Sequence, residues 1–380
     1  MSSPAVSEGH WTSGFDVGSI KTPAYVYSVD EVSRCIRALK AALGTAVLIS
    51  FKACPLLEII SRLPEDCWDG VELASRGELH MFAGHRPRHF YVNTPSLNES
   101  LVRSALGAKA SLVIDAPSQL SLIDKVRGSR TIQPISLRLS NQLISYLCPE
   151  APRLRPDQFG MDLEIACECI ETARCLGIDV DGVHLFAGPN AFGRVGQHVV
   201  AAVERLLPML EQHLNHPLRI ANLGGGLEED WAEKSHDFRL YRTALSRLPP
   251  TLEIIHEFGR AIFAPAGVFA TRVVSMKRIA GRLYAVCDGG IAQAFLLAGT
   301  ENFLRRQRRP QVANRSSANS LDSAKTIIVG SSCSQKDVIG ETTDRLMEGD
   351  VLLFDGCGAY FRTYSMNGFL SLSEPAVYVF

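Results

Sequence analysis

The sequence predicts an α/β protein with a (β/α)₈ TIM-type barrel and a C-terminal all-β domain that an N-terminal strand joins. Three observations indicate this. Short apolar runs alternate with helical patterns from residue 46 to residue 257. After residue 266 the segments become β-rich, with no convincing amphipathic helix between them. With 380 residues, of which 46% are hydrophobic and 21% charged, the chain can bury two cores. A doubly wound open sheet is the alternative for the first region.

The chain begins its regular structure with an expected strand at 22–28 (TPAYVYS). Ser28 and Glu31 form a capping box for the next helix. That helix places its apolar residues on one face and ends at Gly44; the face consists of Val32, Cys35, Ile36, Leu39 and Leu43.

The barrel strands are expected where apolar runs precede helical patterns. They are 46–51, 70–74, 89–92, 111–114, 134–139, 181–186, 218–222 and 252–257. Pro55 is expected to open the helix after the first of these strands. Ser75 with Glu78, and Ser96 with Glu99, predict two further capping boxes at strand-to-helix crossings.

The all-β domain is expected from five strands at 268–279, 283–287, 325–329, 351–354 and 376–380. We therefore predict a barrel domain at 36–265 and a β domain formed by 1–35 together with 266–380. The arginine-rich segment 305–310 and the Ser/Asn-rich stretch that follows it to Ser323 predict an exposed loop.

Composition argues against several classes of partner. A net charge of −1 gives no support for binding to nucleic acid or to a membrane surface. No apolar run reaches the length of a membrane span, and residues 1–18 lack the layout of a signal peptide, so we expect a cytoplasmic protein. The 10 cysteines are expected to be buried thiols. Cys167, Cys169 and Cys175 share one predicted helix without a second cluster, so we expect no metal site.

Polar residues gather where the barrel strands end, which is the active-site face of this fold. They include Lys52, Glu72, Ser75, Arg138, His184, Gly224–Gly226 and the segment His256–Arg260. A partly desolvated lysine is a nucleophilic amine that can form a Schiff base, and glycine N–H groups can close on an anion. Each residue also has a plainer interpretation: Lys52 as a surface lysine, His184 as a packed core residue, and the glycines as a turn.

Nine segments in order give the chain a resemblance to the fold-type III pyridoxal-phosphate (PLP) decarboxylases, the ornithine and diaminopimelate decarboxylase superfamily. They are SFKA, GVELASRGEL, QFGM, GVHLFAG, NLGGG, EFGR, CDGG, GSSCSQKD and GDVLLFDGCGAY. The resemblance covers nearly the whole chain. It implies a PLP-dependent carboxy-lyase that forms homodimers with active sites at the interface. In that superfamily an N-terminal strand joins the β domain.

The resemblance also implies roles for individual residues. Lys52 would hold PLP covalently, and His184 would stack on the cofactor ring. Glu257 would pair with the pyridine nitrogen, which favours decarboxylation over racemisation. Cys333 would reprotonate the product from across the dimer interface. The phosphate would lie against Gly224, Gly225, Gly226, Gly259, Arg260 and Tyr360, other cofactor contacts would come from Glu72 and Arg138, and substrate contacts from Ser334, Asp337 and Tyr360.

Three departures from the superfamily pattern affect the expected substrate. Phe186-Ala187 replaces a phosphate-binding serine segment, Glu72 replaces an aspartate, and Ser334 replaces the acid that follows the cysteine. An uncharged Ser334 would leave a distal substrate ammonium unpaired. The pattern resembles a branch that decarboxylates a citrate-linked 2,3-diaminopropionate to a citryl-diaminoethane in carboxylate siderophore (staphyloferrin B-like) biosynthesis. The loop at 305–309 would then bind carboxylates or be merely solvated.

Two alternatives to that substrate remain. One is a decarboxylase of a free or carrier-bound amino acid such as diaminopimelate, lysine or ornithine. The other is a non-catalytic regulator, as antizyme inhibitors are in this superfamily. The presence of Lys52, Glu257 and Cys333 argues against the regulator.

Overall fold

The computed structural model describes residues 16–85, 87–298, 309–313 and 321–380. These residues form two compact units. One is Ser33–Ala261, and the other combines the described part of Met1–Val32 with that of Ile262–Phe380. A closed eight-stranded barrel lies in the first unit and an eight-stranded sheet in the second, so the predicted fold class is confirmed. The domain bounds at 36–265 stay a prediction, because compactness does not by itself show independent folding.

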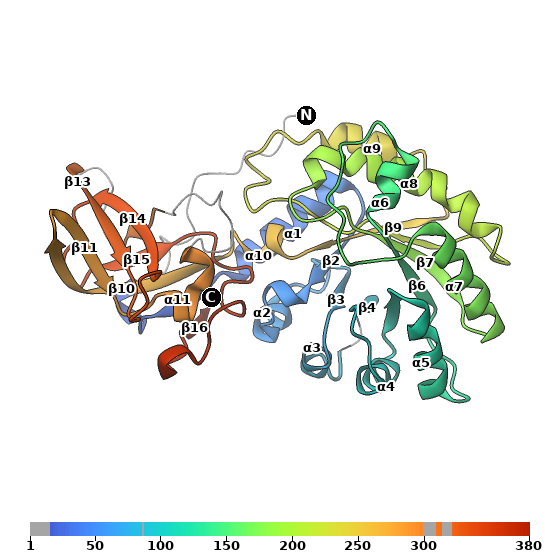
Figure 1. The fold of residues 1–380 in the computed structure, drawn as a ribbon, viewed down its shortest axis with the longest axis horizontal. Coiled ribbons are helices and arrows are strands. Elements are labelled where there is room, and N and C mark those ends of the chain that lie inside the picture. Colours follow the sequence, from blue (N-terminus) through green and yellow to red (C-terminus); the bar gives the residue numbers. More distant parts are fainter. Residues whose placement is uncertain (1–15, 86, 299–308, 314–320) are drawn as a thin grey trace. The chain divides into compact units, whose positions relative to one another are not determined.

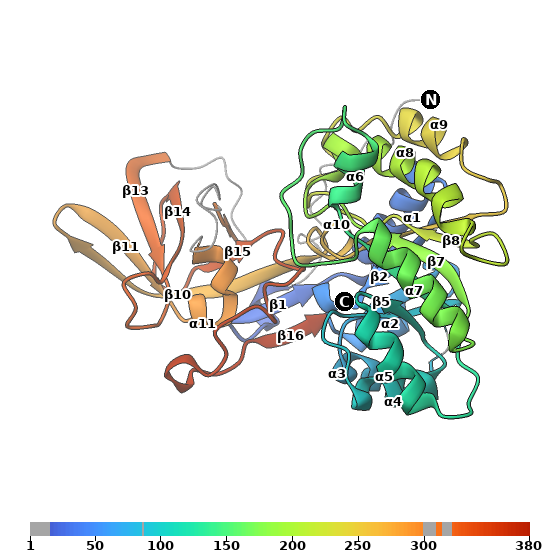
Figure 2. The same ribbon diagram turned by 45° about the vertical axis from the view of Figure 1, so that its right-hand side comes forward.

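The barrel strands follow one another around the barrel in sequence order and all run parallel (Figures 1 and 2). They are β2 (Ala46–Ser50), β3 (Gly70–Leu73), β4 (His89–Asn93), β5 (Ser111–Ile114), β6 (Ile135–Leu139), β7 (Val180–Leu185), β8 (Ile220–Asn222) and β9 (Glu253–Phe258). The helices of this unit lie on the outside of the barrel. They are α1 (Val29–Leu43), α2 (Leu57–Arg62), α3 (Arg76–Met81), α4 (Glu99–Ala108), α5 (Pro117–Arg127), α6 (Gln142–Leu147), α7 (Leu163–Cys175), α8 (Phe192–Glu211) and α9 (Phe238–Leu245).

Burial of the apolar strand residues explains why these short segments form a barrel. The cluster of Leu48, Tyr91, Val113 and Ile255 brings together side chains of β2, β4, β5 and β9. The five predicted apolar residues of α1 are each at most 2% exposed. Strand register then sets the site, because it places Ser50 beside Glu72 and aligns Arg138, His184 and Asn222 on three consecutive strands.

Two local expectations at helix starts are wrong. The helix expected to open at Pro55 begins at Leu57, after the short 3₁₀ helix η3 (Phe51–Ala53). Helix α4 is capped by Asn98, whose Oδ1 accepts from the N–H of Leu101 at 3.0 Å, and not by Ser96. Both residue types cap helices well, so the sequence alone does not choose between them.

In the second unit, β1 (Ala24–Tyr27) lies between β10 (Gly267–Ile279) and β16 (Ala376–Val379), as Figure 2 shows. The predicted joining of the N-terminal strand to the β domain is therefore confirmed. The remaining strands of this sheet are β11 (Arg282–Cys287), β12 (Gln311–Val312), β13 (Leu321–Val329), β14 (Val338–Asp344) and β15 (Val351–Phe354). Its core contains Val26, Val268, Ala270, Val351 and Leu353.

Short elements complete the chain. They are the helices α10 (Arg260–Phe263) and α11 (Ile291–Ala294) and the 3₁₀ helices η2 (Val17–Ser19), η4 (Phe295–Ala298) and η5 (Phe369–Ser371). The predicted loop to Ser323 falls largely outside the described residues, since 305–308 and 314–320 are not described. Where the structure does describe it, β12 and the start of β13 show that part of this segment is strand.

Candidate active site

Lys52 forms an ion pair at the carboxyl ends of β2 and β3. Its Nζ donates to both carboxylate oxygens of Glu72, at 2.9 Å each. The Oγ of Ser50 donates to Oε2 of the same carboxylate at 2.7 Å. The Glu72 side chain is 0% exposed and the Lys52 side chain is 42% exposed. These partners satisfy a buried carboxylate that would otherwise be costly, and they hold the lysine amine at a fixed place.

A second buried carboxylate, Glu257, lies near the end of β9. Its Oε2 is 3.3 Å from Nε2 of His184 on β7, and its Oε1 accepts from the side-chain amide of Asn222 on β8. Burial by itself raises the pKa of Glu257. His184, Lys52 and the Asn222 amide act in the opposite direction, and the resulting pKa lies below the usual value of 4.5. Glu257 is therefore an ionised carboxylate at neutral pH.

The three glycines after β8 form a tight loop next to Glu257. Oδ1 of Asn222 accepts from the N–H of Gly224 at 2.9 Å, so one asparagine connects the carboxylate to the loop. Gly224 and Gly226 have φ angles of +61° and +91°, which favour glycine. The N–H groups of Gly225 and Gly226 donate to no other residue in the described part of the chain. These amides can therefore bind an anion.

Arg138 at the end of β6 is held by neighbours on three sides. Its guanidinium carbon lies 4.2 Å from the ring centroid of Phe159. One guanidinium nitrogen lies 3.4 Å from Oδ1 of Asn93 and 3.9 Å from Oδ2 of Asp115. The N–H of Gly160 in the QFGM segment donates to the other oxygen of Asp115. Arg138 thus has a fixed orientation with its side chain 10% exposed.

The remaining predicted site residues lie directly after β9 or in the second unit. Gly259 and Arg260 directly follow β9, and Arg260 begins α10. Tyr360 lies in the second unit, with a φ of +68° that is rare for a residue with a side chain. Cys333, Ser334 and Asp337 share the turn between β13 and β14 in that unit. Cys333 is exposed and Asp337 is buried.

The barrel unit therefore brings Lys52, Glu72, Arg138, His184, Glu257 and Gly224–Gly226 to one end of the barrel. Sequence reasoning did not find their supporting residues, which are Ser50, Asn93, Asp115, Phe159 and Asn222. Asn222 could have been found, since it ends β8 two residues before the first glycine of the loop. The contact between Phe159 and Arg138 had no local signal.

Residues 24–358 match a family described as "Pyridoxal-dependent decarboxylase, C-terminal sheet domain". The chain belongs to this family. It is an enzyme, a PLP-dependent amino-acid decarboxylase, as the resemblance in its motifs predicted.

Two curated relatives and one solved structure show how far this similarity extends. The chain is 25% identical over 362 residues to diaminopimelate decarboxylase from Haemophilus influenzae, covering 91% of this chain and 85% of the relative. It is also 25% identical over 342 residues to 2-[(L-alanin-3-ylcarbamoyl)methyl]-2-hydroxybutanedioate decarboxylase from Staphylococcus aureus, covering 84% and 83%. A lysine/ornithine decarboxylase from Vibrio vulnificus, complexed with cadaverine, shares the fold with a TM-score of 0.80, 20% identity and 96% coverage of both chains.

The barrel residues of this decarboxylase fit PLP. Nδ1 of His184 is buried and has no hydrogen-bond partner among the described residues, which leaves it available to a ligand. The unpaired N–H groups of Gly225 and Gly226 suit a phosphate. An ionised Glu257 suits a protonated pyridine nitrogen, and Lys52 supplies a primary amine. These are the donor and acceptor types that the cofactor requires.

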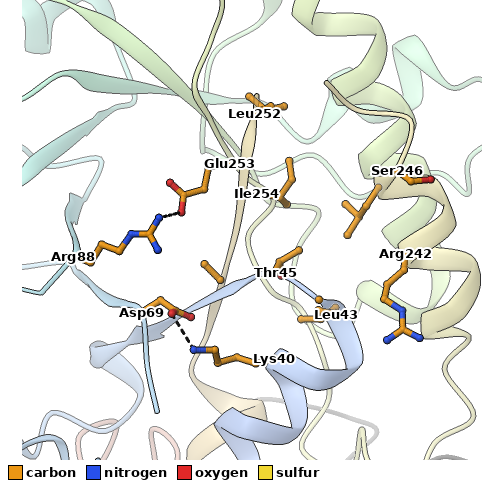
Figure 3. Close-up of a pocket in the computed structure, with 13 residues that line it drawn as sticks. Lys40, Leu43, Thr45, Asp69, Arg88, Arg242, Ser246, Leu252, Glu253 and Ile254 are labelled. Atoms are coloured by element: carbon orange, nitrogen blue, oxygen red, sulfur yellow. Dashed lines mark hydrogen bonds and ion pairs between the residues drawn. The ribbon is translucent and has the colours of Figure 1, made fainter. Parts of the chain in front are cut away.

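A pocket of about 620 Å³ lies at the other end of the barrel strands (Figure 3). It is lined by residues at the start of β2 and β9, including Ala46 and Glu253. Four of its five charged side chains pair with one another, Lys40 with Asp69 at 2.9 Å and Arg88 with Glu253 at 2.6 Å, while Arg242 donates to the carbonyl oxygen of Ala41 at 3.1 Å. In this fold the amino-terminal face contributes to stability, so we do not place the active site there.

No helix in the described ranges is both long and apolar enough to cross a membrane. Across the same residues, no three His, Cys, Asp or Glu side chains are grouped so that they could hold a metal ion. Seven of the cysteines are buried thiols as expected, whereas Cys167 is half-buried and Cys175 and Cys333 are exposed.

Proposed function

We propose that this decarboxylase acts on an amino acid whose distal end carries carboxylates. The substrate we assign is citrate-linked 2,3-diaminopropionate, which would give citryl-diaminoethane in carboxylate siderophore biosynthesis. The observation that supports this assignment is the charge of the turn that contains Cys333, together with the matching substrate in one relative's name.

The turn at 331–336 contains one charged side chain, that of Lys336. Ser334 takes part in local bonds, since its N–H donates to Oγ of Ser332 at 3.3 Å and its Oγ accepts from the N–H of Lys336 at 3.2 Å. The nearby carboxylate of Asp337 is buried and bonded to backbone N–H groups. The turn thus offers no exposed carboxylate to a substrate ammonium, whereas the exposed Lys336 ammonium suits a substrate carboxylate.

We assign the site residues as follows. Lys52 carries the cofactor, and the N–H groups of Gly225 and Gly226 bind its phosphate. Glu257 holds a proton at the pyridine nitrogen, and His184 supports the ring. When bound, PLP would supply an electron sink for the pair that remains as carbon dioxide leaves. The thiol of Cys333 then gives its proton to the Cα atom and regains a proton from water.

The relatives support the assignment without deciding it. The S. aureus relative is named for a substrate that joins an alanine-3-yl amide to a hydroxybutanedioate. The H. influenzae relative, at the same 25% identity, is named for diaminopimelate. Identity therefore favours neither substrate, and we base the choice between them on the side chains of the Cys333 turn.

The test is a substrate panel with wild type and Ser334→Asp, scored by carbon dioxide release. Wild type is expected to turn over the citrate-linked diaminopropionate roughly 100-fold more efficiently, in kcat/KM, than lysine, ornithine or diaminopimelate. Ser334→Asp is expected to reduce that kcat/KM by roughly 100-fold, because a carboxylate then faces the substrate carboxylates.

Ser331→Asp is the matched control, because Ser331 is an exposed serine of the same turn. It adds the same charge and is expected to leave both kcat/KM values within about twofold of wild type. Equal turnover of diaminopimelate and the citrate conjugate by wild type would reject the substrate assignment and leave the family membership intact.

We also propose that the enzyme is a cytoplasmic homodimer with active sites at the interface. The support is the resemblance of the GSSCSQKD segment, whose cysteine acts across a dimer interface in the superfamily. Complementation between Lys52→Ala and Cys333→Ala chains tests this assembly.

A further inference from the structure

Asp337 occupies an unusual position for an acidic residue, because it is only 3% exposed. Oδ1 accepts from the N–H of Ile291 at 2.9 Å, and Oδ2 accepts from the N–H of Ser332 at 2.9 Å. No Lys, Arg or His of the described chain forms an ion pair with it. Charge-assisted bonds from backbone amides thus replace the water that this carboxylate loses on burial.

The backbone of Asp337 closes the same turn. Its N–H donates to the carbonyl oxygen of Ser334 at 3.0 Å, and its carbonyl oxygen accepts from the N–H of Gly330 at 3.0 Å. Ser332 and Ser334 are the two neighbours of Cys333. Asp337 is therefore bonded to the residues on both sides of that cysteine.

Two glycines make room for the carboxylate. A Cβ added to Gly290 would lie 2.4 Å from Oδ1 of Asp337 and 2.6 Å from the Cα of Gly330. A Cβ added to Gly330 would meet Oδ1 at 2.4 Å and the Cα of Gly290 at 2.4 Å. The backbones of Gly290 and Gly330 thus approach each other without intervening side chains. The Asp337 carboxylate connects the two segments, because it accepts from the N–H groups of Ile291 and Ser332.

We propose that Asp337 is a positioning residue that fixes the direction of the Cys333 thiol, and not a substrate-binding acid as the sequence suggested. A carboxylate whose two oxygens both accept backbone N–H groups can bind a substrate cation only by breaking those bonds. The Cys333 thiol is exposed and forms no hydrogen bond in the described part of the chain, so its backbone determines where the thiol points. The assignment rests on the proposed role of Cys333 as proton donor.

The first test measures amide hydrogen exchange, in wild type and then in Asp337→Asn. Hydrogen exchange is expected to show the amides of Ser332 and Ile291 protected, although Ser331 and Gln335 nearby are exposed. Asp337→Asn keeps the shape but turns one acceptor into a donor. It is expected to speed exchange at one or both amides roughly tenfold. Unprotected amides in wild type would overturn the proposal without any variant.

The second test measures the reactivity of the Cys333 thiol. Alkylation by iodoacetamide, followed by peptide mapping, is expected to show a change of roughly threefold or more in the Cys333 rate in Asp337→Asn, while exposed Cys175 keeps its rate. The control is Asp350→Asn, because Asp350 also accepts from a turn N–H, that of Met347 at 2.7 Å. An unchanged Cys333 rate in Asp337→Asn, or an equal change in the control, would contradict the proposal.

A kinetic measurement connects this role to the reaction. With a substrate that wild type decarboxylates, Asp337→Asn is expected to lower kcat roughly tenfold or more and to leave KM within about twofold, since only the proton donor moves. A rise in KM with kcat unchanged would favour substrate binding and overturn the proposal. If wild type released no carbon dioxide from any amino acid, the proposed function would fail, while the exchange and alkylation results would still decide the role of Asp337.

Discussion

At the scale of single residues, the barrel unit holds two buried carboxylates in different ways. Glu72 is neutralised directly by Lys52 and by a serine hydroxyl. Glu257 has an asparagine amide and a histidine as its closest partners. The first carboxylate can therefore hold the amine in place, while the second keeps a negative charge that a cationic ring nitrogen can meet. Two acids on one barrel rim are thus suited to separate tasks because their neighbours differ.

Glu257→Gln is expected to lower kcat for decarboxylation by about 100-fold or more, because a neutral amide no longer holds a proton at the ring nitrogen. The glutamine oxygen can still accept from Asn222. Cofactor affinity, measured by absorbance titration, is therefore expected to change by less than about tenfold.

Glu253→Gln is the control for this substitution. It lies on the same strand but at the opposite end, where Glu253 pairs with Arg88. It is expected to retain the wild-type kcat. A Glu257→Gln enzyme with full turnover would show that this carboxylate does not support the reaction.

At the scale of elements, β9 presents alternate side chains to different surroundings. Glu257 belongs to the site, whereas the neighbouring His256 contacts outer elements. Its Nε2 lies 2.8 Å from the hydroxyl of Tyr241 on α9, and its Nδ1 lies 2.9 Å from Oγ1 of Thr45 before β2. Burial lowers the pKa of His256 to about 3, although Glu257 acts in the opposite direction. The imidazole is therefore neutral in the folded protein.

This burial predicts a pH dependence of stability. Below the usual histidine pKa of 6.5 the unfolded chain binds a proton at His256 and the folded chain does not, so the free energy of unfolding decreases as the pH falls from 6.5 towards 3. The slope from this residue is about 1 kcal/mol per pH unit. Urea unfolding at pH 7 and pH 5 is expected to show a smaller difference for His256→Gln than for wild type. His213→Gln, at a partly exposed histidine on the surface, is expected to keep the wild-type difference.

Sequence periodicity predicted the eight barrel strands because each is a short run of buried residues, as in Leu48–Ile49 of β2. It did not predict β14, whose residues 338–344 (VIGETTD) mix glycine and polar side chains and become a strand by pairing with β13. Pairing between distant segments carries no local signal.

The site shows the same division between local and distant information. Strand ends identified Lys52, His184 and Glu257, because the carboxyl ends of parallel strands meet. The support of Arg138 by Asp115 and Phe159 depends on how separate loops pack, and the spacing of residues in the sequence does not contain it. The burial of Asp337 also depends on packing between distant segments, those around Gly290 and Gly330, so the sequence did not predict it.

At the scale of the whole molecule, the proposed reaction needs residues from both units. Lys52 belongs to the barrel unit and Cys333 to the β unit. If each active site takes Lys52 from one chain and Cys333 from its partner, Lys52→Ala and Cys333→Ala are each inactive but can complement one another. Random reassembly of equal amounts makes half of the dimers mixed, and each mixed dimer has one intact site. Mixing is therefore expected to restore about a quarter of the wild-type activity.

If each site instead takes both residues from one chain, every site in the mixture lacks either Lys52 or Cys333. Mixing is then expected to restore no activity. Activity of the reassembled mixture, with sedimentation to confirm dimers, decides between these arrangements. The control is reassembly of each variant alone, which is expected to stay inactive. Inactive mixtures that sediment as dimers would contradict the shared site. Mixtures that sediment as monomers would contradict the homodimer itself.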